Sequence, residues 1–513
     1  MKKIALLLIS IILACVFCFG VSADYLSTKD IYPIDEYGKN ALVLLNNGYL
    51  LYGETEKREP VIIAENVNEV TFPKSWPADK AIVKYRNDSI ALLKYNMTKN
   101  VMELENPCAE NVMTVIDIPK AETNFDYLYI DKEGNLKGLR YNENILVMTD
   151  ALSVTYAKDY LYMLRNTGEL FRLNCRSNIK NRELLSASAA KISDNVKSFG
   201  VSDRDCVYVT KASEFYVKKE SAENPIKLAS GVSYISNVIL DGSNCVYLTD
   251  NGNVFMYRLK GEKVYDGDYS IKLGENAKKV YVRNSTVYYI DQQDKGYVVS
   301  INEKNIVTQT LYTENVAKFF PEILDLCVNT NGQLFGATKY NTDIVLYDVH
   351  DIANIKAANK NQKWFILKNN GELLIADGGQ RSLTNIRYAP ICDRRTKLFM
   401  YGKEVHLKSP VQIVNERSMY PLRECMEMLG AEILWDDVIK TAIAKLDGKR
   451  VEFPVGKKEY VANGQRIVVD DIAAYVDTSV NLTFVPIRYA AEALGFTVGW
   501  EQGVTYNAIT ISK

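Results

Sequence analysis

The feature that most constrains this chain is a repeat of about forty residues that fills most of its length. In each copy, a short run of apolar and β-branched residues leads into a polar turn, and a second apolar run follows. The turn residues of the nine copies are Gly48, Ser89, Gly134, Gly168, Ser213, Gly252, Gly296, Gly332 and Gly371, and consecutive ones are 34 to 45 positions apart. Each copy predicts a β-hairpin, because Asn-Gly and similar pairs accept the positive φ of a tight turn.

Two weaker strand-like segments follow most of the hairpins, such as residues 60–67 and 68–72 after the first. Four short strands in about forty residues is the size of one propeller blade. A single blade cannot bury both of its faces, whereas blades stacked in a ring cover each other. We therefore predict a β-propeller over residues 24–392, in preference to a β-solenoid or a pair of sandwiches. Its hairpin pattern loosely resembles bacterial RCC1-like and lipoprotein-receptor-like propellers. The number of blades stays open, because nine hairpins need not make nine complete blades.

The first residues predict a signal peptide over positions 1–23. Lys2 and Lys3 precede an almost wholly apolar segment from Ile4 to Gly20, and small residues follow at Val21-Ser22-Ala23. This is the order of features that signal peptidase recognises. A retained membrane anchor, or a lipoprotein modified at Cys15, would be the alternatives. We expect an exported protein that is extracellular or associated with the cell envelope.

Residues 393–513 contain an internal duplication with an offset of 65 positions. Each copy predicts a helix that begins after a proline, carries an Arg–Glu pair four residues apart, and ends at a glycine in the left-handed region. A strand that ends in tryptophan is then expected to pack back on the helix. The duplicated residues are Pro421, Arg423, Glu427, Gly430 and Trp435 in the first copy and Pro486, Arg488, Glu492, Gly495 and Trp500 in the second.

This duplicated segment resembles the copper amine oxidase N-terminal-like (stalk) domain of exported proteins from Gram-positive bacteria. The matching motif runs from Asn415 to Arg423 in the first copy and from Asn481 to Arg488 in the second. Glu416 in place of the usual glycine, and Gly499 before the second tryptophan, depart from the family pattern. The resemblance implies a structural or adhesive role and carries no catalytic residue. The predicted fold class is therefore mainly β, a propeller followed by a small α+β domain.

The composition argues against several functions. A formal net charge of -1 offers no positive field for nucleic acid. The only two histidines, His350 and His406, cannot supply the cluster of imidazoles that copper needs. Seven of the nine cysteines lie singly outside the signal segment, which favours isolated buried thiols over a disulfide scaffold or a zinc site. We expect no cofactor, no metal and no catalytic residue.

Carboxylates could support an enzyme without histidine. Examples are Asp203 with Asp205, Asp291 with Asp294, and Asp436 with Asp437, and most such carboxylates lie in predicted turns. We therefore expect a non-enzymatic surface protein whose propeller recognises a cell-wall glycan or another surface protein, with the C-terminal module as a tether. The alternatives are an envelope polysaccharide hydrolase or lyase and an extracellular protein-binding regulator.

Overall fold

The computed structural model describes residues 26–513 apart from short segments, and it forms two compact units. One unit comprises Ser27–Cys392, and the other contains Asp393–Lys513. The segments that are not described are 36, 58, 73–79, 97–100, 117–126, 141–142, 158–159, 175–188, 203–204, 237–243, 259–269, 284–285, 302–306, 321–325, 339–340, 359–362, 380–381, 393–394, 410, 415–416, 471 and 479. The predicted signal peptide and Cys175 lie outside the described residues.

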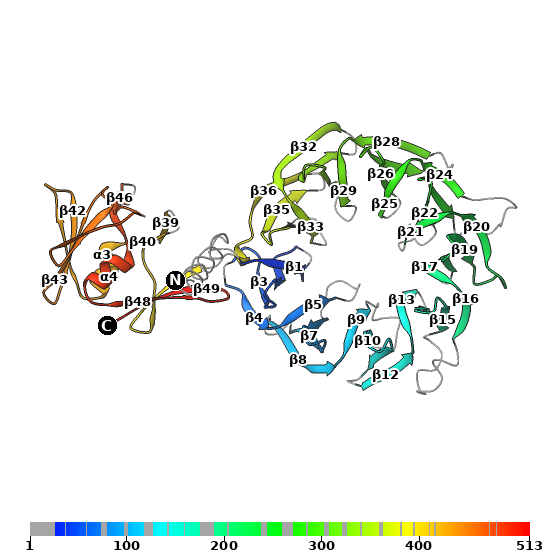
Figure 1. Ribbon diagram of the computed structural model, residues 1–513, viewed down its shortest axis with the longest axis horizontal. Coiled ribbons are helices and arrows are strands. Elements are labelled where there is room, and N and C mark those ends of the chain that lie inside the picture. Colours follow the sequence, from blue (N-terminus) through cyan, green and yellow to red (C-terminus); the bar gives the residue numbers. More distant parts are fainter. Residues whose placement is uncertain are drawn as a thin grey trace, which may run out of the picture. The chain divides into compact units, whose positions relative to one another are not determined.

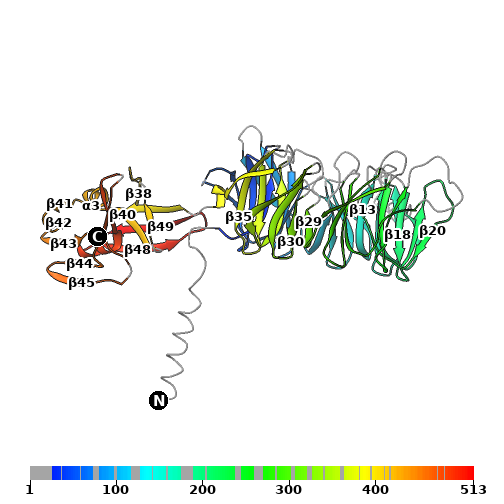
Figure 2. The same ribbon diagram turned by 90° about the horizontal axis from the view of Figure 1, so that it is seen from above.

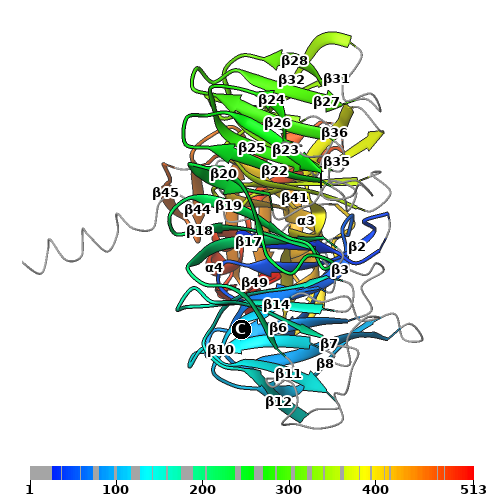
Figure 3. The ribbon, with the colours of Figure 1, turned by 90° about the vertical axis from the view of Figure 1, so that its right-hand side faces the viewer.

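The first unit is a ring of four-stranded antiparallel sheets (Figure 1). Within the described residues there are nine such sheets, each built from four consecutive strands, so the nine predicted hairpins belong to nine blades. The first strand of each blade is innermost and the fourth is outermost (Figure 1). The strands run across the thickness of the ring (Figure 2 and Figure 3). The first unit is therefore a β-propeller, as predicted.

The strands of the nine blades have the following bounds. Blades 1 to 3 contain β1 (Thr28–Pro33), β2 (Asn40–Leu45), β3 (Leu50–Glu54), β4 (Val61–Ala64); β5 (Val67–Thr71), β6 (Lys80–Tyr85), β7 (Ile90–Asn96), β8 (Val101–Ala109); β9 (Val112–Ile116), β10 (Tyr127–Asp131), β11 (Leu136–Arg140) and β12 (Glu143–Met148). Blades 4 to 6 contain β13 (Ala151–Ala157), β14 (Tyr160–Arg165), β15 (Leu170–Asn174), β16 (Ala190–Ser193); β17 (Val196–Ser202), β18 (Asp205–Thr210), β19 (Glu214–Lys218), β20 (Ile226–Ser230); β21 (Val232–Ile235), β22 (Asn244–Thr249), β23 (Val254–Arg258) and β24 (Ser270–Gly274). Blades 7 to 9 contain β25 (Ala277–Arg283), β26 (Thr286–Asp291), β27 (Gly296–Ile301), β28 (Val307–Thr313); β29 (Val316–Phe320), β30 (Leu326–Asn329), β31 (Gln333–Thr338), β32 (Asn341–His350); β33 (Ile352–Ala357), β34 (Lys363–Lys368), β35 (Leu373–Gly379) and β36 (Ser382–Tyr388).

The apolar core of the ring lies between the blades. The second strand of each blade is buried on both faces, as in β2 and β10, and therefore carries an unbroken apolar run. Each buried cluster draws on two consecutive blades; one joins Leu42 and Leu44 of blade 1 to Val67 and Val83 of blade 2. No blade completes a core alone, which is the physical reason for the repetition.

One backbone hydrogen bond recurs at every junction between blades. The residue that closes the turn between the second and third strands has a positive φ, and its carbonyl accepts the N–H at the start of the next blade. Val67 donates to Gly48 in this way at 2.8 Å, and Thr28 donates to Gly371 at 2.7 Å, which joins blade 9 to blade 1. The carbonyls in ring order belong to Gly48, Asp88, Gly134, Gly168, Ser213, Gly252, Asp294, Gly332 and Gly371.

Two of these turns differ from the sequence prediction. The left-handed residues are Asp88 and Asp294, with φ of 62° in both, rather than Ser89 and Gly296. Gly296 instead begins β27. Asp tolerates the left-handed region because its short side chain bonds locally to the backbone, so an aspartate can hold the position that glycine holds in most of the other turns.

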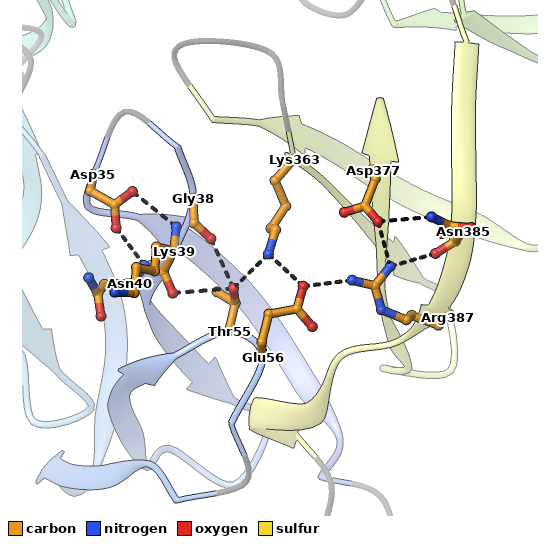
Figure 4. A network of polar contacts seen from close by, with 10 residues as sticks. All are labelled: Asp35, Gly38, Lys39, Asn40, Thr55, Glu56, Lys363, Asp377, Asn385 and Arg387. Carbon is orange, nitrogen blue, oxygen red and sulfur yellow. Dashed lines mark hydrogen bonds and ion pairs between the residues drawn. The ribbon is translucent and has the colours of Figure 1, made fainter. Parts of the chain in front are cut away.

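Side-chain ion pairs add to the closure between blades 1 and 9 (Figure 4). Glu56, just after β3, accepts from Lys363 and from Arg387, both at 2.6 Å. Arg387 also bonds to Asp377 at 3.1 Å. The short 3₁₀ helix η1 (Pro390–Cys392) follows β36, and the N–H of its Ile391 donates to the Thr55 carbonyl of blade 1 at 3.3 Å. Because blades 1 and 9 are far apart in sequence, these contacts close the ring.

The second unit has the duplicated strand–helix–strand pattern. Its strands are β37 (Arg395–Met400), β38 (Lys403–Val405), β39 (Gln412–Val414), β40 (Arg417–Pro421), β41 (Glu432–Asp436), β42 (Thr441–Leu446), β43 (Lys449–Pro454), β44 (Glu459–Ala462), β45 (Gln465–Val468), β46 (Tyr475–Asp477), β47 (Leu482–Pro486), β48 (Thr497–Gln502) and β49 (Tyr506–Ser512). Its helices are α3 (Leu422–Met428) and α4 (Ile487–Ala493). The sheet orders are β38-β37-β49-β48, β39-β40-β47-β46 and β41-β42-β43-β44-β45.

The two copies meet across a local twofold arrangement. Strands β40 and β47 pair antiparallel with Tyr420 opposite Val485, which is its own duplicate 65 positions on. Both helices contribute to one buried cluster, with Met426 from α3 and Ala490 from α4 among its members. The duplication therefore builds a single core from two equivalent halves.

Candidate functional site

A cleft of about 480 Å³ lies where blade 5 meets blade 6. One wall is the outermost strand of blade 5, β20, with Gly231 directly after it. The other wall is the β22–β23 hairpin of blade 6, and Ser270 at the start of β24 completes the lining. Labels β20 and β22 mark these neighbouring strands in green in Figure 1. A cleft of this size accommodates a small molecule or a segment of a polymer.

Aromatic side chains form one side of the cleft. Tyr247 and Phe255 are paired across β22 and β23, and their rings are stacked with centroids 5.2 Å apart and planes at 18°. Phe215 of blade 5 packs against Tyr247 at 4.8 Å. Tyr247 is buried in this stack, whereas Phe255 is half-buried and lines the cleft. The stack therefore holds an apolar ring surface in a fixed orientation.

Polar side chains of the β22–β23 turn lie on the same wall as these rings. The amide oxygen of Asn251 accepts from the Thr249 hydroxyl at 2.5 Å and from the Asn253 amide nitrogen at 2.8 Å. Within the described residues, the Asn251 amide nitrogen and the Asn253 amide oxygen have no hydrogen-bond partner, and neither has the exposed carboxylate of Asp250. These three side chains of the turn thus offer one donor group, one neutral acceptor and one carboxylate.

A second set of aligned side chains lies on the innermost strands. In each of the nine, the register shifts between the first and third residue, so a bulge falls at the same place in every blade. The third residues are exposed or half-exposed, and we call them the inner wall. They are Asp30, Glu69, Thr114, Ser153, Ser198, Tyr234, Lys279, Lys318 and Asn354. Acidic side chains occupy blades 1 and 2, and basic ones occupy blades 7 and 8.

The carboxylate pairs noted in the sequence organise turns. Asp291 is buried and accepts the N–H groups of Gln293 and Lys295 at 2.9 and 2.8 Å. Asp294 forms an ion pair with Lys278 at 2.5 Å.

The remaining pairs have similar roles. Asp205 accepts the N–H of Glu220 at 2.9 Å, and Asp203 lies outside the described residues. Asp436 accepts the N–H of Val438 at 3.0 Å, and Asp437 pairs with Lys440 at 2.6 Å. These contacts account for the carboxylates through local structure.

Neither histidine is a member of either set of side chains. His350 is the last residue of β32 and is exposed. His406 follows β38 directly and is exposed. In the part of the chain that the structure describes, no group of three or more His, Cys, Asp or Glu side chains could hold a metal ion. Six cysteines in the same part are free thiols, and five of them are buried.

The duplicated residues of the second unit frame its two helices. Pro421 and Pro486 are the N-caps of α3 and α4. Gly430 and Gly495 follow the helix ends with φ of 87° and 93°, and their N–H groups donate to Glu427 and Glu492, both at 2.9 Å. These glycines serve the left-handed turn that ends each helix.

The two arginines of the motif are engaged on the helix surface. Arg423 bonds to Glu427 at 3.2 Å, and Arg488 lies 3.8 Å from Glu492. All four side chains are exposed, so each pair contributes little to stability. Pairing accounts for the arginines without an anionic ligand.

The strands that end in tryptophan, β41 and β48, contact α3 and α4 as predicted, but the tryptophan side chains themselves are exposed. Trp435 is 41% exposed and Trp500 is 46% exposed. Ile433, which lies on the same face of β41 two residues before Trp435, is half-buried against the shared core, so the core reaches this face but does not extend to Trp435. The shared core also includes Phe453, Phe496 and Val498.

Comparison with known proteins agrees with this architecture. Residues 399–507 match the family described as the copper amine oxidase N-terminal domain, which confirms the predicted resemblance of the second unit. No curated protein matches the chain. The chain thus combines a β-propeller with a module that matches this family over residues 399–507.

Solved structures that resemble the chain are propellers at low identity. PorZ, an essential surface component of the type-IX secretion system of Porphyromonas gingivalis, is 14% identical over 84% of this chain and 58% of its own length, with a TM-score of 0.31. The C-terminal WD40 domain of Sif2 is 13% identical over 67% of this chain and 93% of its own, with a TM-score of 0.35. Yeast RCC1 (Prp20), solved bound to Kap60, is 13% identical over 44% and 70%, with a TM-score of 0.29. These matches carry no argument about function.

Proposed function

We propose that this protein is an exported, non-enzymatic binding or scaffold protein of the cell envelope. In this proposal the propeller binds a polyhydroxylated ligand, a wall glycan, in the cleft between blades 5 and 6, and the second unit is a tether. Export rests on the signal-type sequence at residues 1–23. In the described residues, no helix is long and apolar enough to cross a membrane.

The composition of the cleft carries the proposal. A sugar ring presents apolar C–H faces and polar hydroxyl edges, and the cleft has the half-buried ring of Phe255 beside the amides of Asn251 and Asn253. Among the described residues that line it there is no lysine or arginine, so the charge of this lining suits a neutral ligand rather than an anionic one. Asp250 is the single carboxylate of this described lining, which supports binding rather than hydrolysis, since hydrolysis uses a pair.

Retention on purified wall material tests the proposal. The mature chain, residues 24–513, is incubated with peptidoglycan and with wall polysaccharide, and soluble sugar products are assayed in the same tubes. We expect retention without product release, and Asn251→Ala is expected to weaken retention about fivefold, the value of one hydrogen bond. Asn370→Ala is the matched control, because Asn370 precedes the turn glycine of blade 9 as Asn251 precedes that of blade 6.

The other outcomes separate the alternatives. Release of sugar products would show an enzyme and overturn the non-enzymatic proposal. Equal loss of retention in both variants would remove the cleft as the binding site. If the wild-type chain shows no retention and releases no sugar product, the glycan ligand is overturned and a protein partner is favoured. A chain that ends at Cys392 tests the tether, which predicts normal retention in solution and loss of envelope association in cells.

A further inference from the structure

The inner wall carries two lysines on neighbouring blades with no described acid beside them. Lys279 and Lys318 occupy the same position, the third residue of the innermost strand, in blades 7 and 8, and both are exposed. The equivalent residues of the flanking blades are Tyr234 in blade 6 and Asn354 in blade 9. The two acidic members of the inner wall, Asp30 and Glu69, belong to blades 1 and 2.

The two lysine-bearing strands are held in fixed relation. Tyr281 of β25 is hydrogen-bonded to the backbone of Phe319 on β29. The Tyr281 and Phe319 rings also meet edge to face, with centroids 5.9 Å apart. Lys279 lies two residues before Tyr281 in sequence, and Lys318 directly precedes Phe319. Their backbone positions are therefore set by the packing between blades 7 and 8 rather than by a flexible loop.

The Lys318 ammonium group is itself positioned. It donates to the Ala353 carbonyl of blade 9 at 3.2 Å and lies 4.6 Å from the centroid of the Phe320 ring. Two of its three N–H groups remain for another acceptor. Partial burial lowers the pKa of Lys318, and the positive charge of Lys279 lowers it further. The ammonium charge of Lys279 therefore disfavours the charged form of Lys318.

Nearby acids are engaged elsewhere. Lys278, which precedes Lys279, pairs with Asp294 at 2.5 Å. Asp30 pairs with Lys356 at 2.6 Å. Within the described residues, Lys279 has no hydrogen-bond or ion-pair partner. As far as the structure describes blades 7 and 8, this stretch of the inner wall therefore carries two like charges without a counter-charge.

We propose that Lys279 and Lys318 together bind a phosphate group, at a site separate from the cleft. A phosphate monoester or inorganic phosphate carries close to two negative charges at neutral pH, so one group offsets both ammonium charges. A carboxylate carries one charge and leaves one lysine uncompensated. The tyrosine hydroxyl and asparagine amide of the flanking blades add neutral donors rather than carboxylates. This site does not depend on the glycan proposal, because it shares no residue with the cleft.

A phosphorus-31 NMR titration of the mature chain tests the site directly. Inorganic phosphate and glycerol 3-phosphate are the monoester-type probes, and glycerol phosphate oligomers are the diester probe. We expect saturable broadening of the phosphate signal by the wild-type protein. Lys279→Ala is expected to weaken binding about tenfold, the value of one charge-assisted hydrogen bond, and Lys279→Arg to preserve most of it. Lys197→Ala, which removes an exposed lysine from the innermost strand of blade 5, is the matched control.

Each outcome of the titration either supports or overturns the phosphate site. Broadening by monoesters that Lys279→Ala removes and Lys197→Ala leaves intact supports the site. Stronger binding of the oligomers than of the monoesters, with the same response to the variants, also supports it and identifies a phosphodiester polymer as the source. No broadening by wild-type protein, or an equal loss in both alanine variants, would overturn the proposal. A competing wall-glycan fragment should leave the phosphate signal unchanged, so failure of the cleft and failure of this site are distinguishable.

Discussion

Replacing Gly371 with alanine probes the closure of the ring. Gly371 has a φ of 86°, and its carbonyl accepts the Thr28 N–H at 2.7 Å across the junction between blades 9 and 1. A Cβ at Gly371 would lie 2.3 Å from the Ser27 hydroxyl oxygen and 3.1 Å from the Asn46 amide nitrogen. Asn46 also donates to the Ser27 hydroxyl at 2.8 Å. The added methyl group therefore strains the turn and displaces the start of blade 1.

The cost follows from these contacts. A left-handed conformation costs alanine about 1–2 kcal/mol. Movement of Ser27 weakens its bond to Asn46 and the Thr28–Gly371 bond, each worth about 1 kcal/mol. We expect Gly371→Ala to lower the free energy of unfolding by about 3–4 kcal/mol in total, close to the range of severe single substitutions.

Gly134→Ala is the matched control. Gly134 holds the equivalent turn in blade 3 with a φ of 80°, but the nearest atom to its Cβ is 3.7 Å away. Gly134→Ala should lower the free energy of unfolding only by the cost of the left-handed conformation, about 1–2 kcal/mol. Urea unfolding of both variants, with hydrogen exchange of a peptide that contains Thr28, measures the difference. An equal loss of stability in the two variants, or unchanged protection of Thr28 in Gly371→Ala, would refute the closure argument.

Three further predictions follow from burial and charge. Burial alone would raise the pKa of Asp131, but the ion pair with Lys137 at 2.7 Å and the bonds from its turn outweigh it and lower the pKa. The stabilisation by the Asp131 carboxylate should therefore be present above the usual aspartate pKa of about 3.9 and disappear as pH falls through the lowered value. The difference in unfolding free energy between wild type and Asp131→Asn should accordingly close on acidification. A difference that is independent of pH would contradict this. Burial raises the pKa of the Cys245 thiol to about 12, so a thiol reagent at pH 8 should leave it unmodified in the native protein and label it after denaturation, as read by mass spectrometry. Because Trp435 and Trp500 are exposed, their replacement by alanine should each cost less than about 1.5 kcal/mol in urea unfolding, against about 3–5 kcal/mol for a buried tryptophan.

Local patterns in the sequence account for the repeat and the duplicated module. The apolar run of each second strand, such as residues 41–45, reflects burial on both faces, and that signal is contained within one blade. The proline and glycine that bound α3 and α4 act within a single helical turn, so their spacing is visible without tertiary contacts. At Asp88 and Asp294, where an aspartate adopts the left-handed conformation, the pattern instead points to a residue one or two positions further on.

Only the tertiary structure decided what depends on neighbours that are distant in sequence or on the orientation of a strand. Glu56 meets Arg387 because the ring closes, and a pairing across more than three hundred residues leaves no local pattern. Lys279 and Lys318 face the same inner wall because two blades pack together, and the cleft exists because β20 borders the next hairpin. The exposure of Trp435 likewise depends on how far the core extends along β41, because Ile433 on the same face packs against it. The sequence by itself determined the repeated blade and most of its turns, because these are set by short-range backbone preferences and burial. The cleft and the lysine pair arise from contacts between neighbouring blades, which the chain acquires only when the blades pack together.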